Sequence, residues 1–213
     1  MNPKWAEENL QTIRTLMERS ALYRRALAPV MTLAGALGIL GGLAAWRLHI
    51  DTDSGFLKLW GGVAVVALTG ALLLVRRQAL KDSEPFWSPP TRRVAQALLP
   101  GFFIGSALAV LALIAFKYSS PDEYDEVLPR VLVIIWTWFY GCSIHAAGFF
   151  MPRGVRWLGW IFIMAGMTLL VYMVLSTGHL RSVSPHCLMA ATFGGLHLAY
   201  GIYLYFTEKK NPA

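Results

Sequence analysis

The sequence predicts an all-α, polytopic membrane protein, a bundle of six transmembrane helices with an interfacial amphipathic helix at its N-terminus. Three observations support this prediction. Of the 213 residues, 56% are hydrophobic and only 15% are charged, whereas soluble domains carry about 25% charged residues. Six segments stay apolar over about 20 residues, the length at which a helix crosses a bilayer. None of these segments has an acidic residue in its interior.

Residues 1–26 are expected to form a cytoplasmic amphipathic helix. The apolar positions at helical spacing are Leu10, Ile13, Leu16, Met17 and Ala21. Arg14, Glu18 and Arg25 fall elsewhere on the helical wheel, so the helix is predicted to lie on the cytoplasmic leaflet. The favoured interpretation is a topology anchor, and the alternative is a docking helix for a cytosolic partner.

The six-helix bundle is expected over residues 27–206, followed by a cytoplasmic tail over 207–213. Its spans are predicted at 27–46, 57–75, 95–116, 128–151, 155–175 and 184–206. Tryptophans and tyrosines stand near the span ends, where their rings favour the membrane interface. The second loop contains three prolines and is not expected to be helical throughout. The fourth loop is so short that spans four and five must form an antiparallel hairpin.

Loop charges predict the orientation of the bundle. The N-terminal segment, the second and fourth loops and the tail hold 14 of the lysines and arginines, and the other loops hold 5. The positive-inside rule therefore places both termini in the cytoplasm. The net charge of +7 follows from this topology. A nucleic-acid partner is not expected, because no basic stripe alternates with stacking aromatic side chains.

Small residues recur at a spacing of four in three spans. They are Ala34, Gly38 and Gly42, then Gly101, Gly105 and Ala109, then Ala191, Gly195 and Ala199. Such stripes let helix backbones approach closely in lipid. They predict either a compact bundle or contacts between copies of the chain, and the spacing does not separate these two interpretations.

Two histidines, His145 and His197, fall inside apolar spans, in the half of the membrane that faces the cytoplasm. With them we predict an intramembrane polar cluster that also holds Thr137, Tyr140, Cys142, Ser143, Thr192 and Tyr200. The favoured interpretation is structural, with neutral imidazoles that hydrogen-bond across helices. A proton or substrate pathway is the second interpretation, since intramembrane ionisable groups mark such pathways. Haem binding by both histidines, with Cys142 as a further cofactor-binding candidate, is the third.

Two further sites are considered and not favoured. His49, Asp51 and Asp53, together with His179 and His186, offer nitrogen and oxygen ligands for a divalent cation on the outer side. Their spacing is not diagnostic, so a solvated loop is favoured. An intramembrane serine protease built on Ser143 and His197 lacks the expected glycine–serine turn and oxyanion donor. No catalytic residue and no cofactor are predicted.

Four stretches resemble an uncharacterised family of bacterial six-span inner-membrane proteins. They are IRTLMERS (13–20), FWSPPTRRVAQALLPGFFIG (86–105), IIWTWFYGCSIHAAGFF (134–150) and FGGLHLAYGIYL (193–204). The resemblance implies a single domain in a bacterial inner membrane. It also implies a gene that lies near genes of small winged-helix regulators, and hence a regulatory or stress-linked role in which the N-terminal helix contacts a partner protein. It supplies no catalytic residues.

These observations favour a non-enzymatic membrane protein with a sensing, regulatory or scaffolding role. Its working parts are predicted to be the N-terminal helix and the proline-rich second loop. A small transporter or channel with a polar path near His145 and His197 is the second hypothesis. A haem- or quinone-associated redox subunit is the third. The expected partners are the lipid bilayer, a second copy of the chain, or a membrane or cytosolic protein bound through residues 1–26.

Overall fold

The computed structural model describes residues 26–83, 85–118, 127–175 and 183–208. Within these ranges the chain is helical, with turns and short connections and no strand. Six helices are long and apolar enough to cross a membrane, which confirms the predicted all-α, multi-pass architecture. The predicted amphipathic helix falls, apart from its last residue, outside the described residues, and so does the tail beyond residue 208.

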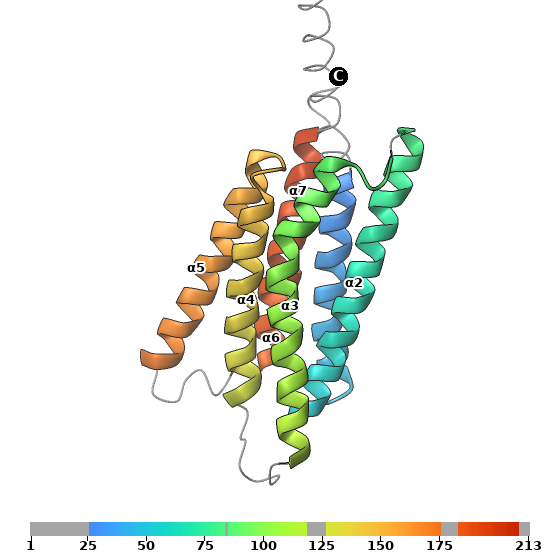
Figure 1. Ribbon diagram of the computed structural model, residues 1–213. Helices are drawn as coiled ribbons and strands as arrows, with labels where there is room; N and C mark the ends of the chain where they lie inside the picture. The colour runs from blue at the N-terminus through green and yellow to red at the C-terminus, as the bar shows by residue number, and fades with distance from the viewer. Residues whose placement is uncertain (1–25, 84, 119–126, 176–182, 209–213) are drawn as a thin grey trace, which may run out of the picture.

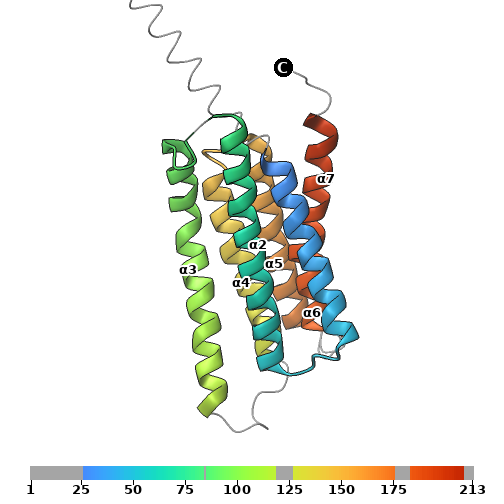
Figure 2. The ribbon, with the colours of Figure 1, turned by 90° about the vertical axis from the view of Figure 1, so that its right-hand side faces the viewer.

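The six spans run alongside one another as one bundle (Figures 1 and 2). They are the first helix (Ala26–Arg47), α2 (Asp53–Lys81), α3 (Pro89–Tyr118), α4 (Val127–Ala147), α5 (Arg153–Leu175), and a sixth span made of α6 (Pro185–Met189), η2 (Ala190–Leu196) and α7 (His197–Glu208). The first helix begins and α7 ends at the same end of the bundle, which we name the terminal end. The opposite end, where residues 48–52 join the first helix to α2, is named the distal end.

Polar residues at its two ends extend α2 beyond the apolar segment 57–75. The hydroxyl oxygen of Thr52 accepts a hydrogen bond of 3.1 Å from the backbone N–H of Gly55 and so caps the first turn. Asp53 lies in the first turn and Lys81 in the last, which is the arrangement that the helix dipole favours. The helix therefore extends beyond the predicted apolar segment at both of its ends, from Asp53 to Lys81.

The prolines of the second loop start a helix instead of only interrupting one. Pro89 and Pro90 form the first turn of α3, where a missing backbone N–H removes no intrahelical hydrogen bond. The hydroxyl groups of Ser88 and Thr91 lie 2.9 Å apart across this turn, and both residues are buried. The non-helical part of the loop is thereby confined to the few residues between Lys81 and Pro89.

The sixth span changes its helical type near its middle. Ser184 caps α6, whose first residue is Pro185, and the chain then forms the π-helical segment η2 before it returns to α-helix at His197. A π-turn holds more residues than an α-turn. Residues after η2 therefore face a different direction from the one that an uninterrupted α-helix would give them. This rotation determines which neighbours His197 meets.

Glycines set the close approach of the first helix to the sixth span. A Cβ atom on Gly38 would lie 2.6 Å from the Cα atom of Gly194, and one on Gly42 would lie 2.6 Å from the Cβ atom of Ala190. The first-span stripe thus packs within the chain. In the sixth span the facing residues are Ala190 and Gly194, one position before the expected Ala191, Gly195 and Ala199. Both sets repeat every four residues, so spacing alone does not select the face.

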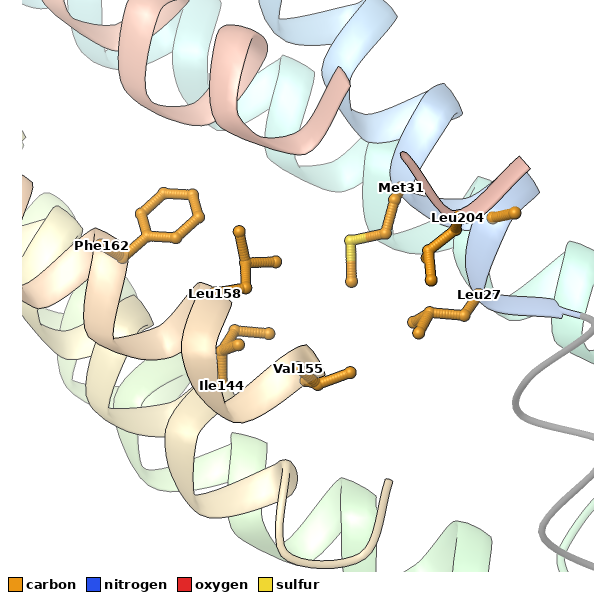
Figure 3. Close-up of a cluster of buried hydrophobic side chains, with 8 residues drawn as sticks. Leu27, Met31, Ile144, Val155, Leu158, Phe162 and Leu204 are labelled. Atoms are coloured by element: carbon orange, nitrogen blue, oxygen red, sulfur yellow. The ribbon is translucent and has the colours of Figure 1, made fainter. Parts of the chain in front are cut away.

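Two apolar clusters hold the bundle together, one toward each end. The cluster at the terminal end joins the first helix, α4, α5 and α7, and its side chains converge in Figure 3. Its members are Leu27, Ala28, Met31, Ile144, Val155, Leu158, Phe162 and Leu204. The cluster at the distal end joins α2, α3, α4 and α6. Its members are Phe56, Leu57, Trp60, Ala112, Leu132, Val133 and Met189.

Candidate functional site

His197 lies among aromatic rings contributed by α4, α5 and η2. Only 3% of its surface is exposed. The centre of its ring lies 5.2 Å from that of Tyr140, 5.2 Å from that of Phe162 and 6.3 Å from that of Phe193. The histidine is therefore enclosed by the side chains of three neighbouring elements.

Both ring nitrogens of His197 take part in hydrogen bonds. Nδ1 lies 2.6 Å from the carbonyl oxygen of Phe193, which only accepts, so Nδ1 carries the hydrogen. Nε2 then accepts from the hydroxyl group of Tyr140 at 2.5 Å. The result is a neutral imidazole that ties α4 to the sixth span. This is the geometry expected of a structural intramembrane histidine.

His145 faces α5 and not the sixth span. Its Nδ1 atom lies 3.3 Å from the carbonyl oxygen of Arg156, and its ring meets that of Trp160 at a centre distance of 5.4 Å. The two helices approach closely here, since a Cβ atom on Gly159 would lie 2.6 Å from the backbone nitrogen of His145. The short fourth loop places α4 and α5 in this antiparallel contact.

The two histidines do not fit the ligation of one haem iron. His145 and His197 have different hydrogen-bond partners and different ring neighbours. A bis-histidine iron needs two imidazole nitrogens that face each other across the metal. To bind one iron, His197 would have to break its hydrogen bond to Tyr140, and the side chain of His145 would have to turn away from its contacts with α5.

The two threonines of the predicted cluster bond to their own helices. The hydroxyl group of Thr137 donates to the carbonyl oxygen of Val133 at 2.6 Å, and that of Thr192 donates to Leu188 at 2.8 Å. Such bonds within one turn satisfy a hydroxyl group inside an apolar span. Neither threonine therefore extends the Tyr140–His197 pair into a polar path.

Ser143, Cys142 and Tyr200 lie at separate places. Ser143 is buried against α3, where a Cβ atom on Gly101 would overlap its hydroxyl group. Cys142 is exposed on the surface of the bundle. The hydroxyl oxygen of Tyr200 lies where a Cβ atom on Gly154 would be 2.6 Å away, so this ring packs against the start of α5. Of the predicted cluster, the structure brings Tyr140 and His197 into direct contact and distributes the other members over several interfaces.

A polar pocket lies at the distal end, where the loop 48–52 meets α2, α4 and α6. It has a volume of about 170 Å³. The polar and charged residues that line it are Asp51, Thr52, Asp53, Arg130, Ser184 and His186. Two of these are almost fully buried, with Arg130 4% and His186 8% exposed. The Nε atom of Arg130 donates to the carbonyl oxygen of Val183 at 3.4 Å. A cation, two carboxylates and an imidazole thus surround one cavity.

His186 connects three elements at the wall of this pocket. The indole Nε1 atom of Trp60 lies 3.0 Å from its Nδ1 atom. Its Nε2 atom lies 2.9 Å from the carbonyl oxygen of Ile50. The ring also meets Phe56 edge-on, with centres 5.1 Å apart, and Phe56 in turn stacks on Trp136 of α4.

The residues proposed from the sequence for a divalent cation are partly gathered at this pocket. Asp51 and Asp53 line it, together with His186. His49 is exposed and adopts a positive φ of 50°, in the turn that ends the first helix. Within residues 26–83, 85–118, 127–175 and 183–208, no three His, Cys, Asp or Glu side chains are grouped so that they could hold a metal ion. His179 falls outside these ranges.

Comparison with models of protein families, with curated proteins and with solved structures finds no match.

The sequence analysis missed the part that Trp60 and Arg130 play. It places the tryptophans near the span ends, Trp60 among them, at the membrane interface, and Arg130 is one of the five cations that it counts in the other loops. One signal was available, because Arg130 stands two residues inside the predicted span 128–151, where a cation needs a partner. Phe56 and Trp60 also stand four residues apart and share one face of α2. No sequence pattern pairs Phe56 or Trp60 with His186, which lies more than a hundred residues further along the chain.

Proposed function

We propose that this chain is a non-enzymatic sensing or regulatory protein of a bacterial inner membrane, with both termini in the cytoplasm and the distal end outside. One observation carries the proposal. The buried side chains of Arg130 and His186 line a cavity at the distal end, where His186 joins the pocket to α2. The histidine deeper in the bundle, His197, has both nitrogens occupied and is enclosed by aromatic rings. This arrangement suits a receiving site on one side better than a path through the bundle.

The contact through which the protein would pass on its regulatory signal, here called the output, is assigned to the cytoplasmic side. The second loop joins α2 to α3 at the terminal end, and the first helix begins at the same end. The basic residues of this loop and of residues 1–26, most of which precede the first helix in the sequence, suit contact with anionic lipid or an acidic partner surface. The resemblance to bacterial six-span proteins supports the same regulatory role. A second copy of the chain, or a membrane or cytosolic protein, is the partner proposed for this segment.

Orientation is tested with a reporter that is active only in the cytoplasm, fused after Ala213, and with the same reporter inserted after Asp51. Activity from the first fusion and none from the second is expected. The reverse pattern would overturn the orientation and would place the pocket inside the cell.

The regulatory role is tested by comparing transcripts in cells that lack the gene with those in cells that express the full chain or a variant in which Leu10, Ile13, Leu16 and Met17 are replaced by serine, which keeps every cation of residues 1–26. The variant is expected to reach the membrane in normal amounts and to reproduce the transcript changes of the deletion strain. Full activity of this variant would contradict the assignment of the output to this segment.

The redox alternative has its own simple measurement. The purified chain is expected to show no Soret band in its visible absorption spectrum, because His145 and His197 do not present their nitrogens to one iron. A Soret band that disappears in the His197→Gln variant would instead favour the haem-associated subunit.

A further inference from the structure

The attachment of α2 to the bundle is concentrated near its two ends. Its buried residues are Phe56, Leu57 and Trp60 in the first turns and Ala79 near the last turn. All residues between Trp60 and Ala79 are at least partly exposed. Trp60 is thus one of three buried side chains, with Phe56 and Leu57, that hold the distal part of α2 to the bundle.

The hydrogen bonds of His186 define the state of its ring. An indole N–H only donates, so the Nδ1 atom of His186, 3.0 Å from Trp60, must offer a lone pair. A carbonyl oxygen only accepts, so the Nε2 atom, 2.9 Å from the oxygen of Ile50, must carry the hydrogen. The ring is therefore neutral in this arrangement and links α6 both to α2 and to the distal loop.

A second proton on His186 is incompatible with the bond to Trp60. The proton would occupy Nδ1, and two N–H groups would then face each other. The bond from Nε2 to Ile50 would become charge-assisted and stronger. Protonation thus separates the two contacts, because the loop stays bound to α6 while the indole of Trp60 is released.

The pocket provides a route for the proton, because His186 forms part of its wall. The charged groups that face this wall are Asp51 of the distal loop, Asp53 of α2 and Arg130 of α4. The first helix contributes Gly42, whose added Cβ atom would lie 3.6 Å from the carbonyl oxygen of His186. Burial of the ring opposes an imidazolium ion, and the nearby carboxylate of Asp51 favours one. Imidazole is the side chain that changes charge between about pH 5 and pH 8.

We propose that His186 is a pH-dependent latch. At neutral pH the imidazole holds the indole of Trp60, and with it the turn of α2 that carries Trp60, against α6. As the pH on the distal side falls, protonation through the pocket releases Trp60. This deepens the proposed function by naming acidity as the signal, and it depends on that proposal only for the side of the membrane on which the pH acts.

The test follows the indole N–H of Trp60 by NMR in micelles of the full chain labelled with ¹⁵N-tryptophan, with its resonance assigned through the Trp60→Phe variant. Between about pH 8 and pH 4 the resonance is expected to move from a hydrogen-bonded to a free position. In His186→Gln, whose amide does not titrate, the resonance should not change with pH. His49→Gln, which removes an exposed histidine near the same loop, should titrate like the unmutated chain.

A resonance that is constant over this range, or one that titrates equally in His186→Gln, would overturn the latch. A second measurement covers the case in which His186→Gln does not fold. With ¹³C-labelled histidine, the titration midpoint of His186 is compared in the unmutated chain and in Trp60→Phe. Loss of the indole donor removes an interaction with the neutral ring, so the midpoint should rise by about half to one pH unit. An unchanged midpoint would also overturn the proposal.

Both measurements are independent of orientation, so they separate the latch from the proposed function. If the latch titrates in micelles and the reporter fusions place the distal end in the cytoplasm, the latch stands and the outward sensing role fails. If the fusions place it outside and Trp60 does not respond to pH, the latch fails and the sensing role needs another signal.

Discussion

Individual residues with small or neutral polar side chains determine how closely the helices of this bundle approach. Gly38 and Gly194 let two backbones touch, and the Tyr140–His197 pair satisfies two polar groups where water is absent. In a bilayer such contacts replace the hydrophobic driving force that packs soluble helices. Their removal should therefore be felt in the stability of the whole chain.

The Tyr140→Phe variant should lose about 1 to 3 kcal/mol of unfolding free energy, because the Nε2 atom of His197 is left buried without a donor. Unfolding by sodium dodecyl sulfate in mixed micelles measures this loss. Tyr203→Phe is the matched control, since Tyr203 is 58% exposed and its change should stay within about 0.5 kcal/mol. Equal effects of the two variants would count against a structural role for the His197 pair.

Alanine at two glycines should act in opposite directions. Gly38→Ala forces the first helix away from Gly194 and should cost about 1 to 3 kcal/mol. Gly61→Ala should be neutral or stabilising, because no atom lies within 4 Å of its added Cβ atom and alanine favours the helix. Thermal unfolding of both variants in the same detergent gives the comparison. The packing assignment would be wrong if Gly61→Ala were the more harmful change.

Among the helices, α2 and the sixth span show how local features act on whole elements. The π-helical segment η2 rotates α7 so that His197 meets Tyr140. α2 meets the bundle through a few side chains of its first turns, with Phe56 at their centre between His186 and Trp136. The rest of α2 presents apolar side chains outward, as expected for a helix that borders lipid.

Phe56→Ala should therefore cost about 3 to 5 kcal/mol, the usual loss for a buried aromatic side chain. Phe56 is 1% exposed, whereas Leu72 on the same helix is 50% exposed. Leu72→Ala should change the unfolding free energy little, because the exposed side chain of Leu72 faces lipid in the folded bundle and an equally apolar surrounding after unfolding. Proteolysis of the two purified variants, read as the rate of cleavage near residues 48–52, tests whether the distal end of α2 has loosened. Equal cleavage rates would argue against this attachment.

For the molecule as a whole, the distribution of basic residues is predicted to hold the bundle in one orientation. Replacing Arg76, Arg77, Arg92 and Arg93 with glutamine lowers the cations on the terminal side from 14 to 10, against 5 on the distal side. A measurable fraction of chains should then insert in reverse, read from the reporter after Ala213. Arg47→Gln with Lys58→Gln, on the distal side, should leave the orientation unchanged. A single orientation in both variants would show that loop charge does not decide it.

Some of the site followed from residue types alone. The sequence groups Tyr140 with His197 because both are polar and lie at neighbouring depths in apolar spans, and in the structure their side chains form a hydrogen bond. The sequence could not show that His145 and His197 lie at different helix interfaces, since depth says nothing about the direction in which a side chain leaves its helix. The contact between Trp60 and His186 depends on the packing of α2 against α6, elements separated by more than a hundred residues.

The number of spans and the all-helical architecture follow from local composition, because each segment must satisfy its own backbone hydrogen bonds in lipid whatever its neighbours are. The loop charges likewise predict an orientation before any contact is known. Which faces meet depends on rotations about the helix axes, and those depend on glycine contacts and on the π-turn before His197. A helix of uniform apolar character carries little information about its own rotation, so the histidine partners and the distal pocket emerge only when all six spans pack together.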